Sequence, residues 1–197
     1  MFIKLNSIKE EYEKRYRNRL SICYPSIGST GFQERNQTSN FLAAAESLVP
    51  NLFTWFEFQV EGAKKADNHL DAIAIDFGAK EIWLIESKRI QTEKKFKAIE
   101  SDRKRMTALA NRPETIFDRF YEKSGVPFDE FHIYGLTLAD VWNYEGQRDA
   151  RQKAYQYYLT KSKDAGANSR CLIIEIPIKG THHQWQYRLI IDAKRLK

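Results

Sequence analysis

Two short segments near the middle of the chain constrain its fold more than any other feature. Residues 70–77 read Leu-Asp-Ala-Ile-Ala-Ile-Asp-Phe, and residues 81–90 read Glu-Ile-Trp-Leu-Ile-Glu-Ser-Lys-Arg-Ile. Both are rich in the apolar and β-branched residues that favour strands. The Gly78-Ala79 pair between them favours a tight turn. We therefore expect two antiparallel strands that form a hairpin.

The other segments predict helices and further strands around this hairpin. Capping-box patterns beginning at Ser7 and Thr30 predict helices that reach about Leu20 and Leu48. The remaining expected elements are a strand over 52–61, helices over 93–110, 113–125 and 145–164, a strand over 131–138, and a hairpin of strands 171–178 and 184–192 about Gly180. Consecutive strands with helices before and after them favour a mixed α/β sheet flanked by helices, not a doubly wound parallel sheet.

Length and composition narrow the class of protein. A chain of 197 residues without internal repeats predicts one domain over 1–197. No apolar run is long enough for a membrane span or a signal peptide, so we expect a cytoplasmic protein that does not contact membranes. Two cysteines and four histidines show no zinc-binding spacing. The net charge of +6 favours a polyanionic partner, but only weakly.

Three charged residues of the predicted hairpin are expected to meet at one end of it. Side chains alternate between the faces of a strand, so Glu86 and Lys88 share a face. A two- or four-residue turn places Asp71 directly opposite Glu86, whereas a three-residue turn would place them on opposite faces. The favoured register therefore brings two carboxylates and an ammonium group together.

This set of groups suits a divalent cation and phosphate chemistry. Two adjacent carboxylates repel unless a cation lies between them, and their hard oxygens suit Mg²⁺, for which Mn²⁺ can substitute. We expect Asp71, Glu86 and the backbone carbonyl of Ser87 to bind the metal, and Lys88 to stabilise the transition state. The reaction that this chemistry favours is metal-assisted hydrolysis of a phosphodiester.

In these residues the chain resembles the PD-(D/E)XK nuclease superfamily, which has the restriction-endonuclease-like fold. Asp71 matches the acid on the first strand of the motif, and Glu86-Ser87-Lys88 matches the acid-x-Lys triplet on the next. Leu70 stands where the motif has its proline. The resemblance implies a core of order αβββαβ over about residues 30–138, with an extra N-terminal helix and a C-terminal β-hairpin.

A third acid is expected on the helix that precedes the strands. Gly31-Phe32-Gln33-Glu34-Arg35 resembles the helix start of archaeal Holliday-junction resolvases, which makes Glu34 an auxiliary metal ligand or water-orienting acid. Helical spacing also places Glu34 on the apolar face of its helix. The alternative is an acid favoured only by the helix dipole. Asp76 is an alternative to Asp71, but it lies on the opposite strand face.

The helix after the motif is basic. Between residues 88 and 105 eight lysines and arginines stand against three acids. A surface of this kind beside a metal site favours contact with a nucleic-acid backbone, although a solvated helix face with internal ion pairs is the alternative. The residues that we expect to contact DNA are Arg89, Lys94, Lys95, Lys97, Lys104 and Arg105.

The sequence favours a Mg²⁺-dependent DNA endonuclease that acts on duplex or branched DNA. Two alternatives stay open at this point, namely a non-catalytic DNA- or protein-binding module on the same fold and a ribonuclease. If the enzyme cuts both strands of a duplex, one site per chain favours a homodimer.

Overall fold

The computed structural model describes residues 1–23, 34–59, 69–112, 127–144, 149–164, 166–177 and 185–197. Its elements run in the order α1 (Phe2–Cys23), α2 (Glu34–Glu46), β1 (Phe53–Gln59), β2 (His69–Asp76), β3 (Glu81–Ile90), α3 (Glu93–Ala110), η1 (Phe128–Glu130), β4 (His132–Tyr144), α5 (Ala150–Lys163), β5 (Ser169–Pro177) and β6 (Trp185–Arg195).

The strands form one mixed sheet in the order β1-β2-β3-β4-β6-β5. Strands β1, β2 and β3 form an antiparallel meander, and β4 runs parallel to β3 after the crossover through α3. Strands β6 and β5 extend the sheet beyond β4, again antiparallel. The predicted mixed α/β sheet flanked by helices is therefore confirmed, and so is the order α2, β1, β2, β3, α3, β4 in its middle.

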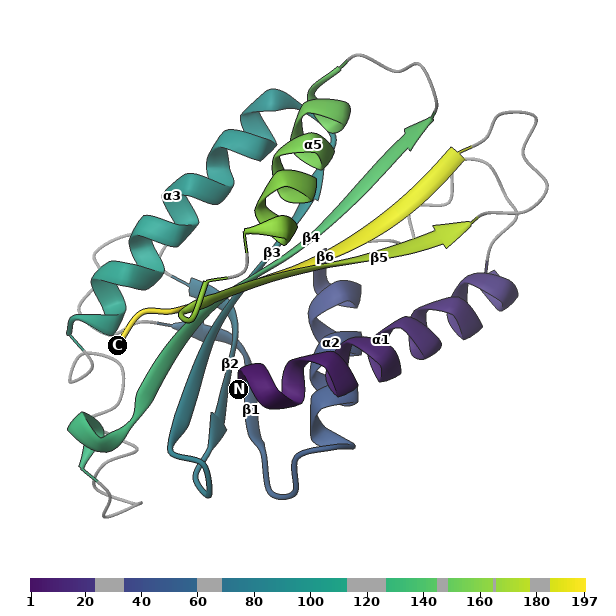
Figure 1. Ribbon diagram of the computed structural model, residues 1–197. Helices are drawn as coiled ribbons and strands as arrows, with labels where there is room; N and C mark the ends of the chain where they lie inside the picture. The colour runs from purple at the N-terminus through teal and green to yellow at the C-terminus, as the bar shows by residue number, and fades with distance from the viewer. Residues whose placement is uncertain (24–33, 60–68, 113–126, 145–148, 165, 178–184) are drawn as a thin grey trace.

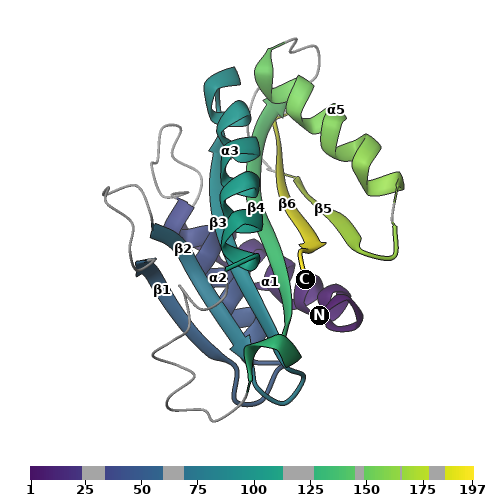
Figure 2. The same ribbon diagram turned by 90° about the vertical axis from the view of Figure 1, so that its left-hand side faces the viewer.

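Helices cover both faces of the sheet, α1 and α2 on one side and α3 and α5 on the other (Figures 1 and 2). The α1–α2 side holds the largest apolar cluster, in which Tyr12 of α1 and Phe41 of α2 pack with Trp83 of β3. On the opposite face Met106 of α3 packs with Leu84 of β3. Since β3 carries buried residues on both faces, it lies at the centre of the core.

Several elements have bounds that differ from the prediction, and α1 and β4 differ most among the described residues. Helix α1 begins at Phe2 and passes through Ser7, because Leu5, Ile8 and Tyr12 already follow a helical spacing and are buried. Strand β4 continues past residue 138 to Tyr144, because Ala139 and Val141 are buried and the strand pairs with β3 as far as Val141 and with β6 as far as Tyr144. The expected helix over 113–125 and the Gly180 turn lie outside the described residues.

The register of the central hairpin is the one that the sequence favours. Ala72 pairs with Ile85 and Asp76 with Glu81 across β2 and β3, and residues 77–80 form a four-residue turn. The same register continued by one residue sets Asp71 opposite Glu86. No helix in the described part of the chain is both long enough and apolar enough to cross a membrane.

Candidate functional site

Asp71 lies where β2 separates from β3. The paired residues of the two strands end at Ala72 and Ile85, and beyond them the Asp71 carboxylate accepts a hydrogen bond of 2.6 Å from the backbone N–H of Ser87. A side chain thus takes the place of a main-chain partner at this point. Burial raises the pKa of Asp71, although the bond from Ser87 and the charge of Lys88 oppose the rise.

Glu86 is almost completely buried on the face of β3 that α3 covers. Its carboxylate forms an ion pair with Arg105 of α3, and Lys88 Nζ lies 3.8 Å from its other oxygen. Burial raises the pKa of Glu86 to about 8, and the nearby negative charge of Asp71 adds to the rise. The two cations therefore do not fully compensate for the burial of this carboxylate.

Lys88 lies between two carboxylates, one from its own strand and one from α3. Its Nζ atom is 3.2 Å from Asp102 Oδ2, closer than it is to Glu86. Burial would lower the pKa of Lys88, but Asp102, Glu86 and Asp71 outweigh it and raise the pKa above the ordinary value. The ammonium group consequently stays charged in a mostly enclosed position.

Glu34 begins α2 and reaches the end of β3. Its Oε1 atom accepts a hydrogen bond of 3.0 Å from the backbone N–H of Arg89 and lies 3.5 Å from Lys95 Nζ. The negative charges of Glu34 and of Glu57 in β1 both raise the pKa of Asp71. The structure thus brings Glu34 to the same end of the sheet as Asp71, as the sequence predicted.

Buried polar contacts fix α2 against this part of the sheet. Thr38 Oγ1 lies 2.6 Å from Ser87 Oγ, on the face of β3 opposite to Glu86. The preceding residue, Gln37, donates a hydrogen bond to Asp140 of β4, and both residues are inaccessible to solvent. Burial raises the pKa of Asp140 to about 7, while Arg89 and Gln37 lower it only in part.

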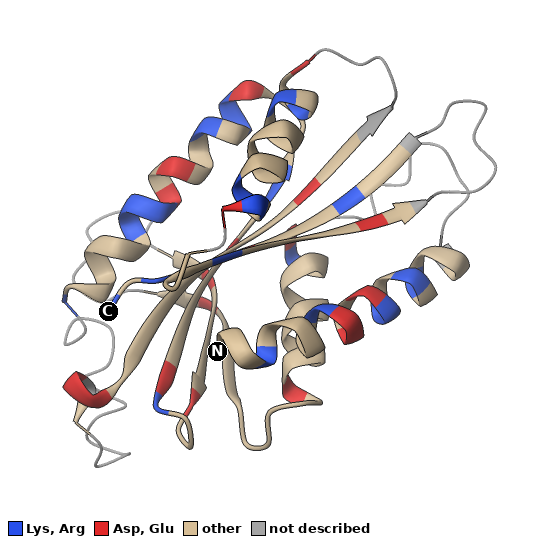
Figure 3. Ribbon diagram, viewed as in Figure 1, with Lys and Arg blue, Asp and Glu red and all other residues tan. Residues whose placement is uncertain are grey.

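The basic residues that were expected to contact DNA occupy different surroundings. Arg105 points into the site, where it pairs with Glu86 and lies 3.1 Å from Asp102. Lys97 forms an exposed pair with Glu93 within α3. Lys94 and Lys104 are exposed, and the ribbon of Figure 3 shows that basic and acidic positions alternate along α3. Helix α3 thus presents part of its charge to solvent and uses part inside the site.

The sequence analysis did not identify two functional candidates, Asp102 and Asp140. Asp102 is buried on α3 between Ile99 and Met106. The sequence could have indicated it, because it is a single acid on the apolar face of an amphipathic helix. Asp140 is fully buried in β4, but the predicted strand stopped before it. By contrast Asp76 binds Lys4 at the far end of β2, so it is not an alternative to Asp71.

The donor set suits Mg²⁺ in kind. Asp71 and Glu86 offer hard oxygen atoms. Burial raises the pKa of each carboxyl, so the cations nearby do not fully compensate the negative charge that the ionised groups would carry. In the described ranges no group of three or more acidic, histidine or cysteine side chains is arranged to hold a metal ion. A metal bound here would therefore depend on two carboxylates, main-chain oxygens and water, which is common for Mg²⁺.

Comparisons with known proteins identify no relative of this chain. No family model matches the sequence, and neither the curated proteins nor the solved structures contain a significant match.

Proposed function

We propose that this chain is a Mg²⁺-dependent DNA endonuclease of the restriction-endonuclease-like type. One observation carries the proposal: Asp71, Glu86 and Lys88 come from adjacent strands in the register that sets the two carboxylates opposite each other. A buried Glu86 beside the half-buried Asp71, without full compensation of charge, destabilises a fold, so a role in binding a cation explains their presence. The order α2, β1, β2, β3, α3, β4 supports the same fold.

The residues would divide the reaction between them. Asp71 and Glu86 would hold the metal together with the carbonyl of Ser87, and bound Mg²⁺ would supply an activated water and neutralise charge on the phosphate. Lys88 is charged and enclosed, so it can stabilise the negative oxygens that develop in the transition state. Asp102 holds the ammonium group in place, and Glu34 fixes the backbone at Arg89.

A second candidate function is a DNA-binding module without turnover. It is favoured by the ion pair of Glu86 with Arg105, because a carboxylate oxygen already paired with a guanidinium is less available to a metal. The two candidates differ in what Arg105 does. In the nuclease it competes with the metal for Glu86, whereas in a binding module it replaces the metal.

The direct test is incubation of the full chain with duplex DNA, branched DNA and RNA, each with Mg²⁺ and with EDTA. The proposal predicts metal-dependent cleavage of at least one DNA substrate by the wild type and none by Asp71→Asn purified in parallel. Cleavage of RNA alone would make the chain a ribonuclease. DNA binding without cleavage in Mg²⁺ or Mn²⁺ would favour the binding module.

A further inference from the structure

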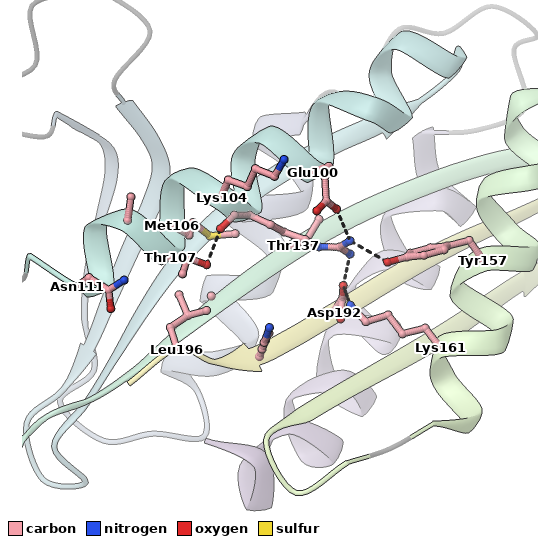
Figure 4. A pocket seen from close by; sticks show the side chains of 14 residues that line it. Glu100, Lys104, Met106, Thr107, Asn111, Thr137, Tyr157, Lys161, Asp192 and Leu196 are labelled. Atoms are coloured by element: carbon pink, nitrogen blue, oxygen red, sulfur yellow. Dashed lines mark hydrogen bonds and ion pairs between the residues drawn. The ribbon is translucent and has the colours of Figure 1, made fainter.

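A cavity of about 550 Å³ lies between α3 and α5, over β4 and β6 (Figure 4). Its volume is within the range of roughly 300–1,000 Å³ that is usual for small-molecule sites. Cross-strand pairing places Thr137 beside Glu86 and Asp192 beside Thr137, so the cavity floor begins one strand away from the candidate catalytic carboxylate. Helix α3 lies over this row, with Arg105 toward Glu86 and Arg103 toward Asp192.

The cavity wall contains a buried acid that holds two cations in place. Asp192 is 3% exposed, and its Oδ2 atom accepts from Arg103 of α3 and from Lys161 of α5 (Figure 4). The other carboxylate oxygen, Oδ1, is buried and has no hydrogen-bond donor in the described part of the chain. A buried acceptor without a donor is costly, so the negative charge of Asp192 is compensated only at Oδ2, by Arg103 and Lys161.

Two further cations line the same cavity without being neutralised. Lys104 of α3 and Lys194 of β6 are exposed, and within the described ranges neither has an ion-pair partner. With Arg103 and Lys161 they give four positive groups against the two carboxylates of Glu100 and Asp192. The excess of positive charge selects for an anion, and phosphate is the anion that lysine and arginine clusters bind most readily.

The rest of the lining suits a flat apolar group. Met106, Gly135 and Leu196 form part of it, and the absence of a Cβ atom at Gly135 leaves room for Leu196, whose Cδ1 atom would lie 3.0 Å from such a Cβ. On the α5 side the ring of Tyr157 is 42% exposed and its hydroxyl accepts from Arg103. An exposed aromatic ring beside cations is a stacking surface for a nucleobase.

We infer that the cavity between α3 and α5 binds a nucleoside phosphate, with the phosphate on Lys104 and Lys194 and the base near Tyr157. The inference goes beyond the proposed function and does not rest on it, since none of the residues that hold the ligand belongs to the Asp71–Glu86–Lys88 set. The nucleoside phosphate can come from two sources, a free nucleotide or one nucleotide of a nucleic acid that extends across α3.

Isothermal titration of the full chain with AMP, adenosine and inorganic phosphate tests the inference. We expect AMP to bind with a Kd below about 1 mM, and adenosine and phosphate to bind at least about tenfold more weakly. The double variant Lys104→Ala/Lys194→Ala should lose about tenfold or more in AMP affinity. The matched control Lys9→Ala/Lys14→Ala removes two lysines from α1 on the opposite face and should bind AMP like the wild type.

A Tyr157→Leu variant separates the base from the phosphate, because it should weaken AMP and leave inorganic phosphate unchanged. Competition by a single-stranded DNA decamer distinguishes the two sources: displacement of AMP indicates a nucleotide of a nucleic acid, and its absence indicates a free nucleotide. Three results would overturn the inference. They are equal affinity for AMP and phosphate, no AMP binding at concentrations up to about 5 mM, and wild-type AMP affinity in the Lys104→Ala/Lys194→Ala variant. A nuclease assay that fails leaves these outcomes unaffected.

Discussion

The Lys88 ammonium lies 3.2 Å from the Asp102 carboxylate, so helix α3 holds the cation that strand β3 carries. Asp102 is itself buried and also contacts Arg105 at 3.1 Å. One acid therefore orders both cations that face Glu86. This arrangement makes Asp102 a positioning residue for the proposed reaction.

Replacing Asp102 by Asn should lower turnover by about tenfold to a hundredfold, the range that is usual for residues that orient a site from behind. Asp102 also raises the pKa of Lys88, so its loss should move the alkaline limb of the pH–rate profile to lower pH. A residue with only a structural role would lower the rate at every pH without this displacement. Glu93→Gln, which removes an exposed acid from the same helix, is the matched control.

Divalent cations should stabilise the folded chain. Binding to the native state at 100 times Kd contributes about 2.7 kcal/mol, which raises Tm by about 5–10 °C for a chain of this size. Thermal unfolding with and without Mn²⁺ measures this, and Asp71→Ala should remove the response. An equal rise in Tm in wild type and Asp71→Ala would place the metal elsewhere in the molecule.

Arg105→Ala should increase the affinity for metal. The guanidinium pairs with Oε1 of Glu86 in this structure, so its removal leaves that oxygen free to bind a cation. The Mn²⁺ concentration for half of the full Tm shift should fall below that of the wild type. If it stays the same or rises, Arg105 does not compete with the metal, and the binding-module alternative gains support.

Stability should decrease as the pH rises from about 5 to 8. Burial raises the pKa of Asp140 to about 7 and that of Glu86 to about 8, so in this window the native state holds protons that the unfolded chain has released. Each such carboxyl lowers the free energy of unfolding by up to about 1.4 kcal/mol per pH unit. Denaturant unfolding at several pH values measures the slope.

Amide variants assign the pH dependence to single residues. Asp140→Asn should remove the part of the slope below about pH 7, and Glu86→Gln the part that continues to about pH 8. The exposed acid Glu13 of α1 offers the control, since Glu13→Gln should leave the slope intact. A wild-type stability that rises over this pH range would show that the two carboxyls are charged in the native state.

The sequence predicted the hairpin and its register because the information there is local. Strand β3 and helix α3 were predicted with the bounds that the structure has, since an apolar strand and an amphipathic helix each have a clear periodicity. The register of Asp71 against Glu86 followed from the parity of a short turn. Local patterns therefore sufficed to identify the acids and the lysine of the proposed site.

What the sequence could not supply are contacts between elements far apart in the chain. Nothing local shows that Asp102 reaches Lys88 or that Gln37 reaches Asp140, because both depend on how helices lie on the sheet. The same holds for Arg105, which charge counting assigned to a DNA-binding surface and the structure places against Glu86. These residues differ from their exposed neighbours in how deeply their charges are buried, and the sequence does not show this burial.

Lys94 and Lys97 on the exposed face of α3 should contribute to DNA affinity, whereas Lys88 of the proposed site should contribute to turnover. Lys94→Ala/Lys97→Ala should weaken DNA binding at all sequences and flatten its salt dependence by about one unit of slope for each lost phosphate contact. Turnover at saturating DNA should be kept. Lys9→Ala/Lys14→Ala on α1 controls for the change in net charge.

The most direct test of the proposed function is the cleavage rate of Lys88→Ala at saturating duplex DNA and Mg²⁺, measured together with its DNA affinity. Because Lys88 is expected to stabilise the transition state more than the bound substrate, cleavage should be abolished while affinity stays within a few-fold of wild type. Near-wild-type cleavage by Lys88→Ala would contradict the account and place the catalytic site outside Glu86-Ser87-Lys88.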